Sequence, residues 1–94
     1  MIAEVKFVGS FRGLSKKSIL RLKFANPVSV EVLTNRVVES LPKLKNELID
    51  PSSGKPRRNM LVLVNGREIS ALNGSETVIN DEDEIVFVPV MHGG

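Results

Sequence analysis

Two short segments that are apolar at every position limit the possible folds of this 94-residue chain more than any other feature. Residues 60–64 read MLVLV, and residues 85–90 read IVFVPV. A half-exposed strand carries polar residues at every second position, so neither segment has a face suited to water. Asn65-Gly66 and the polar corner at residues 80–84 supply turn signals beside them. We therefore expect two strands that carry apolar side chains on both faces of a sheet.

The remaining regular patterns predict two further strands and one main helix. Residues 1–8 and 19–24 alternate with a period of two, which predicts a β-hairpin with a long loop over residues 10–17. Pro27 breaks the second strand, and the Ser29 hydroxyl is suited to cap a following helix. Apolar residues at helical spacing predict that helix over residues 30–41, and Pro42 ends it or opens a second short helical turn.

This order predicts a single α+β domain over residues 1–90, with a mixed sheet packed on one main helix. Neighbouring residues of a strand point to opposite faces, so one apolar set of the two central strands must face away from the helix. The set assigned to the outer face is predicted to be a partner-docking patch. It consists of Leu61, Leu63, Val86 and Val88.

Composition excludes several kinds of site. The chain has no cysteine, which excludes disulfides, thiolate metal sites and a cysteine nucleophile. His92 is the only histidine and has no partners for a catalytic constellation, while the acidic run 81–84 lacks the spacing of a calcium loop. No catalytic residue, bound cofactor or metal is therefore predicted. The start of the chain does not resemble a signal peptide and no segment is apolar enough to span a membrane, so we expect a cytoplasmic, monomeric protein.

The densest positive charge lies in the loop-like stretch before residue 60. Lys55, Arg57 and Arg58 could contact phosphates, but no aromatic residue stands among them to stack on bases. A solubilising or protein-contacting loop is the favoured interpretation. The alternative is a non-conjugated binding module that uses this loop to hold RNA.

The chain ends on a predicted flexible tail, residues 91–94, which consists of Met91, His92, Gly93 and Gly94. Paired glycines at a terminus are common in frayed ends. They also suit a C-terminal carboxylate that must enter a narrow active-site channel, because glycine has no Cβ to obstruct the passage.

The element order, the stretch MLVLVNGREI at residues 60–69 and the ending DEDEIVFVPVMHGG at residues 81–94 resemble a known family. These features are similar to the ubiquitin-like β-grasp proteins, in particular the ubiquitin-related modifier and the small subunit of molybdopterin synthase. The ending His92-Gly93-Gly94 is more similar to the modifier branch.

The resemblance implies a sulfur carrier, a protein modifier, or both, which is a substrate of an enzyme rather than a catalyst. An E1-like adenylating enzyme would use ATP to activate Gly94, with residues 91–93 in its channel and the docking patch on its surface. A rhodanese-type protein or cysteine desulfurase would then supply sulfur for a thiocarboxylate used in tRNA thiolation. Alternatively, a target lysine would attack Gly94, or the protein would be the small subunit of molybdopterin synthase, which delivers sulfur to the molybdopterin precursor in a complex with the large subunit.

Overall fold

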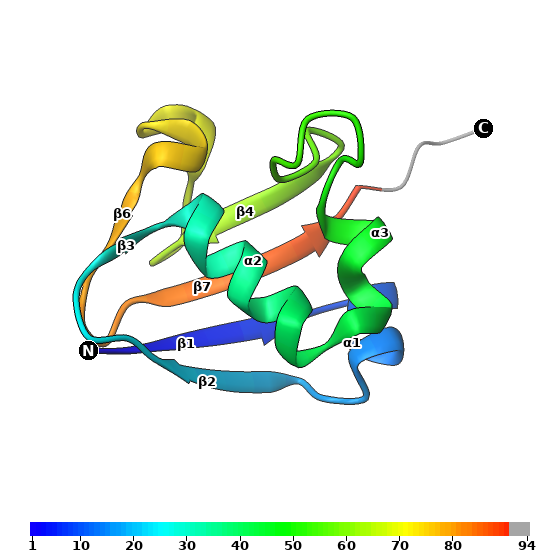
Figure 1. Ribbon diagram of the computed structural model, residues 1–94, viewed down its shortest axis with the longest axis horizontal. Helices are drawn as coiled ribbons and strands as arrows, with labels where there is room; N and C mark the ends of the chain where they lie inside the picture. The colour runs from blue at the N-terminus through cyan, green and yellow to red at the C-terminus, as the bar shows by residue number, and fades with distance from the viewer. Residues whose placement is uncertain (91–94) are drawn as a thin grey trace.

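The computed structural model describes residues 1–90, which form a five-stranded sheet and a small two-stranded sheet, with helices on one side (Figure 1). The large sheet has the strand order β2-β1-β7-β4-β5. β1 and β7 are parallel, and the other neighbours are antiparallel. The strands are β1 (Ile2–Phe7), β2 (Ile19–Lys23), β4 (Met60–Val64), β5 (Arg67–Glu68) and β7 (Glu84–Pro89). The predicted mixed sheet is confirmed.

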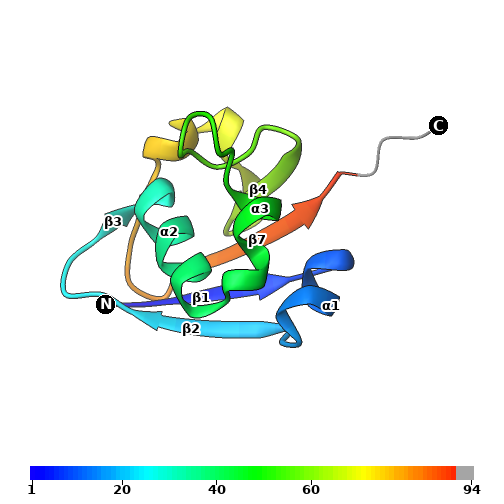
Figure 2. The same cartoon turned by 45° about the vertical axis from the view of Figure 1, so that its right-hand side comes forward.

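The main helix, α2 (Val30–Ser40), lies across one face of the large sheet, as both Figure 1 and Figure 2 show. The predicted cap is present, because the Ser29 hydroxyl accepts a hydrogen bond of 3.2 Å from the Val32 amide. Val30, Leu33 and Val37 are completely buried against the strands. After Pro42, a 3₁₀ turn η1 (Pro42–Leu44) and a short helix α3 (Lys45–Leu48) confirm the predicted second helical segment.

The core forms between α2 and the inner face of the sheet. Val5, Phe7, Ile85 and Phe87 have no more than 1% of their surface exposed, and the Phe7 and Phe87 rings stack with centroids 6.2 Å apart. Thr34 on α2 is also buried, and its hydroxyl donates to the Val30 carbonyl at 2.8 Å. Because this hydrogen bond satisfies the Thr34 hydroxyl, Thr34 can be buried in a close-packed core.

The prediction of a long loop between the first two strands is wrong. Residues 10–15 form a helix, α1 (Ser10–Ser15), which begins after Gly9 at φ +58° and ends at Lys16 in the left-handed region. Phe11 anchors this helix in the core with 3% of its surface exposed. Six residues make fewer than two helical turns, so the segment is too short to show a helical hydrophobic period.

The second half contains elements that sequence periodicity does not reveal. A two-stranded sheet joins β3 (Val28–Ser29) to β6 (Val78–Ile79), and 3₁₀ turns η2 (Ile69–Ala71) and η3 (Gly74–Glu76) lie between β5 and β6. The predicted Asn65-Gly66 turn is confirmed between β4 and β5, with φ of +51° and +82°. Such positive φ values are typical of tight hairpin turns and are most easily adopted by asparagine and glycine.

Candidate functional site

The outer sheet face, defined as Leu61, Leu63, Val86 and Val88, lies opposite α2. The structure pairs Leu61 with Val88 and Leu63 with Val86 across β4 and β7. All four residues are half-buried, whereas the alternate residues Met60, Val62, Val64, Ile85 and Phe87 are buried on the helix side. The structure thus brings the four residues together on one face, as predicted, and their role in docking stays a prediction.

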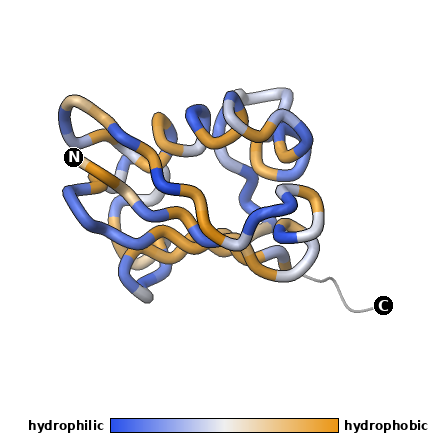
Figure 3. Tube along the Cα trace, turned by 90° about the horizontal axis from the view of Figure 1, so that it is seen from below, coloured by the Kyte–Doolittle hydropathy of each residue, from blue (hydrophilic) through white to orange (hydrophobic). Residues whose placement is uncertain are grey.

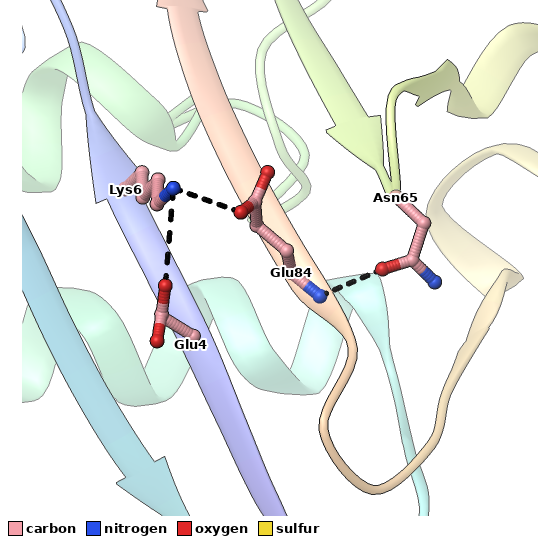
Figure 4. A network of polar contacts seen from close by, with 4 residues as sticks. All are labelled: Glu4, Lys6, Asn65 and Glu84. Atoms are coloured by element: carbon pink, nitrogen blue, oxygen red, sulfur yellow. Dashed lines mark hydrogen bonds and ion pairs between the residues drawn. The ribbon is translucent and has the colours of Figure 1, made fainter.

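An ion-pair network borders the outer sheet face. The Lys6 ammonium lies 2.9 Å from the Glu84 carboxylate and 3.9 Å from that of Glu4 (Figure 4). Its hydrogen bond with Glu84, then the negative charges of Glu84 and Glu4, raise the pKa of Lys6. Lys6 therefore stays protonated over the physiological pH range, and it lies beside Val86 in the parallel pair of β1 and β7. A partner on this face would meet apolar side chains next to a fixed, partly neutralised charge cluster.

Asn65 fixes the start of β7 and hence the position of the network. Its side-chain oxygen accepts from the Glu84 amide at 2.9 Å (Figure 4). Its side-chain nitrogen donates to the Asp83 carboxylate at 2.9 Å. The acidic corner is also structural at Asp81, whose carboxylate accepts from the Ile2 amide at 2.7 Å. The sequence patterns indicated only a turn at Asn65 and a polar corner at residues 80–84. The partners are 18 or more residues apart in the chain, so no local signal could reveal these contacts.

The end of β7 carries the chain toward the predicted tail. Pro89 packs on Gly9, where an added Cβ would lie 3.0 Å from the Pro89 side chain. Gly9 therefore permits a close approach at the base of the tail, in addition to its positive φ. The predicted tail residues lie outside the described residues. They are Met91, His92, Gly93 and Gly94.

Residues 1–90 contain no group of three or more His, Asp or Glu side chains arranged to hold a metal ion. Nor does this part of the chain include a helix long and apolar enough to cross a membrane. The hydropathy colouring in Figure 3 shows hydrophobic and hydrophilic stretches interleaved along the trace. The two surface features on which the functional predictions rest are the outer sheet face and the basic loop, defined as residues 51–59.

Known proteins similar to this chain share its fold over nearly their whole length. Small archaeal modifier protein 3 from Haloferax volcanii is 28% identical over 94 residues, which are 100% of both chains. Small archaeal modifier protein 1 from Methanosarcina acetivorans is 26% identical, with 99% of this chain and 96% of that chain covered and a TM-score of 0.84. Urm1 from Trypanosoma brucei is 28% identical, with coverages of 99% and 95% and a TM-score of 0.72. These similarities confirm the ubiquitin-like β-grasp fold.

The family assignment covers the domain and the chain end together. The ThiS family matches residues 5–94, a span that includes both final glycines. The resemblance to ubiquitin-like sulfur carriers and modifiers is confirmed by this match and by the similar proteins. The chain therefore belongs to the ThiS family, a group of small ubiquitin-like sulfur carriers and modifiers.

Proposed function

We propose that this protein is adenylated at Gly94 by an E1-like enzyme and then delivers sulfur or modifies a lysine. The observation that carries the proposal is the family match, which extends through Gly94. The Gly94 carboxylate attacks the α-phosphate of ATP and releases pyrophosphate, which creates an acyl-adenylate. The protein binds no cofactor of its own in this scheme, and ATP belongs to the activating enzyme.

The acyl-adenylate has two fates that differ in the attacking atom. A persulfide sulfur from a rhodanese-type protein or cysteine desulfurase displaces AMP, and a thiol then cleaves the S–S bond to leave a thiocarboxylate. A thiolation enzyme uses that sulfur on tRNA in the cytoplasm. Alternatively, a target lysine amine displaces AMP through the activating machinery and forms an isopeptide bond with Gly94.

The geometry of residues 1–90 supports a division between docking and chemistry. The outer sheet face includes Val88 on β7, six positions before Gly94. Six extended residues can span at most about 20 Å, so an enzyme docked on this face has Gly94 within reach of an active site at that distance. The apolar face would then supply specificity, while the tail supplies the reacting carboxylate.

Deletion of Gly94 alone tests the proposal. We expect the shortened protein to keep its unfolding midpoint, because residues 1–90 contain the core, and to lose ATP-dependent pyrophosphate release with the activating enzyme. Unchanged pyrophosphate release would contradict activation at Gly94.

Intact-mass analysis of the protein from its native cells identifies the fate. Replacement of one oxygen by sulfur at Gly94 would show the carrier role, and Gly94 remnants on lysines of other proteins would show the modifier role. Capture of a molybdopterin-synthase large subunit would identify the molybdopterin precursor, rather than tRNA, as the sulfur acceptor. If none of these appears and no adenylate forms, the protein acts as a non-conjugated binding module.

A further inference from the structure

A groove separate from the outer sheet face lies between the basic loop and the segment from β5 to η3. It encloses a cavity of about 770 Å³. Its accessible apolar lining is formed by the half-buried Pro56 and Ile69, and Met60 and Val62 contribute only the small part of their surface that the core leaves exposed. The rim carries Lys55, Arg57 and Arg58. Met60 and Val62 alternate along β4 with Leu61 and Leu63, so the groove and the outer sheet face use opposite sides of this strand.

Hydrogen bonds hold the basic loop in one conformation. Ile49 and Pro56 form an isolated antiparallel bridge, and the Asp50 amide donates to the Lys55 carbonyl at 2.9 Å. The Asp50 carboxylate accepts from the Ser52 amide at 2.8 Å and from the Ser52 hydroxyl at 2.7 Å. The three cations are therefore displayed on an organised scaffold rather than on an unstructured loop, which lowers the entropy lost when a ligand binds.

Within residues 1–90, no acid forms a close ion pair with the rim cations, although the Arg57 charge acts on the nearby Asp50 carboxylate. In that part of the chain, the ion pairs within 4.0 Å involve Lys6 and Arg36, and none involves Lys55, Arg57 or Arg58. The Arg57 Nε donates to the Asn46 carbonyl at 2.7 Å, which fixes the guanidinium while its other N–H groups can bind an acceptor. Arg57 is half-buried and so presents a partly desolvated charge. Carboxylates are well matched to such a guanidinium.

The lining favours an acidic peptide over nucleic acid. Asp50 and Glu68 also line the cavity, and these two charges would oppose a dense row of phosphates more than the few separate carboxylates of a peptide. The chain has no tryptophan or tyrosine, and its phenylalanines are buried in the core, so residues 1–90 offer no exposed aromatic ring to stack on a base. An apolar side chain, in contrast, would contact the half-buried Pro56 and Ile69, with neighbouring carboxylates at the cationic rim.

We propose that this groove binds a partner-protein segment in which acidic residues flank an apolar side chain. A second cavity of about 410 Å³ shares Arg57 and Met60 with the first and extends to Pro89 and Val90. The bound segment would therefore lie beside the base of the tail. This inference goes beyond the proposed activation of Gly94 and does not depend on it, since it rests on the side chains of residues 50–75.

The test is a titration of the ¹⁵N-labelled protein with the capped peptide Glu-Leu-Glu-Leu-Asp, followed by NMR chemical shifts. We expect shifts of the amide signals of Lys55, Arg57, Arg58 and Ile69. The neutral peptide Gln-Leu-Gln-Leu-Asn should bind at least about fivefold more weakly, because it lacks the carboxylates. A short single-stranded oligonucleotide is titrated in parallel.

Two charge reversals supply the matched comparison. Arg58 and Lys17 are both exposed and make no ion pair within residues 1–90, but only Arg58 lines the groove. Arg58→Glu should weaken binding of the acidic peptide about fivefold or more, and Lys17→Glu should leave it within about twofold. The proposal is overturned by equal effects of the two changes, by equal binding of the neutral peptide, or by shifts absent from the groove. Groove shifts caused by the oligonucleotide and not by the peptide would likewise overturn it.

Discussion

Replacement of Leu63 by glutamate should separate partner docking from folding. Full burial of a leucine side chain contributes about 1.5–3 kcal/mol, so a half-buried Leu63 accounts for about 1 kcal/mol. Loss of its cross-strand contact with Val86 adds up to about 1 kcal/mol. The new carboxylate can reach water on the open outer sheet face. The free energy of unfolding should thus fall by about 1–2 kcal/mol, from a total of about 5–14 kcal/mol expected for a domain of this length.

The same change should be far more costly in the complex with the activating enzyme. A partner surface that covers the outer sheet face would remove water from the unpaired carboxylate, at a cost of at least about 2 kcal/mol. That free energy corresponds to roughly a thirtyfold loss of affinity. Urea unfolding followed by circular dichroism measures the stability, and isothermal titration calorimetry with the activating enzyme measures the affinity.

Val32→Glu is the matched control, because Val32 is 48% exposed on α2 and lies on the other side of the molecule from the outer sheet face. It should bind the enzyme as the unchanged protein does. In contrast, Val62→Glu should prevent folding, since Val62 is only 2% exposed and its side chain faces the core. A loss of affinity below about threefold for Leu63→Glu would refute the docking role of Leu63. A loss of stability as large as that of Val62→Glu would show that Leu63 is a core residue.

Three further changes test the local arguments. Gly9→Ala should reduce the free energy of unfolding by about 1 kcal/mol or more, because Gly9 has a positive φ and an added Cβ would contact Pro89. Gly13→Ala, at a helix position with open space around it, should be neutral or stabilise the protein by up to about 1 kcal/mol. Thermal unfolding of both variants measures the difference. Ser29→Ala removes the cap of α2 and should cost about 1 kcal/mol in urea unfolding, and a cost near zero would contradict the cap. The hydroxyl and amide of Ser52, followed by the charge of Arg57, lower the pKa of Asp50 below its ordinary value of 3.8. The ionised Asp50 carboxylate therefore stabilises the folded state above pH 3.8, and this contribution is lost as the pH falls through the lower pKa of the folded state. A carboxyl-detected NMR titration should show this pKa, and Ser52→Ala should move it upward; no movement would exclude the Ser52 bonds as its cause.

Local sequence patterns predicted the elements whose physics is local. The Ser29 cap, the period of α2 and the Asn65-Gly66 turn each depend on residues within one or two turns of one another, and the structure confirms them. The fully apolar strands required an apolar outer face for the same reason, because alternation along a strand follows from backbone geometry. Alternation therefore required that one apolar set lie on the outer face, and the structure decided that this set is Leu61, Leu63, Val86 and Val88.

Features formed by residues distant in the chain could not be predicted in this way. Helix α1 is fixed by the burial of Phe11 rather than by its own period, and the β3–β6 pair contains two residues in each strand. The link from Asn65 to Glu84 spans 19 positions. Such contacts exist only after the chain has folded, and no short window of sequence contains both partners.

The sequence by itself determined the α+β order and the presence of an apolar outer face, whichever set of side chains forms it. Both follow from residue type and local backbone geometry. The tertiary structure decided which apolar set faces α2, how Gly9 meets Pro89, and that Arg57 and Ile69 border one groove. A groove depends on the relative positions of separate segments. Those positions are set by packing of the whole core, which is a property of the folded chain and not of any one segment.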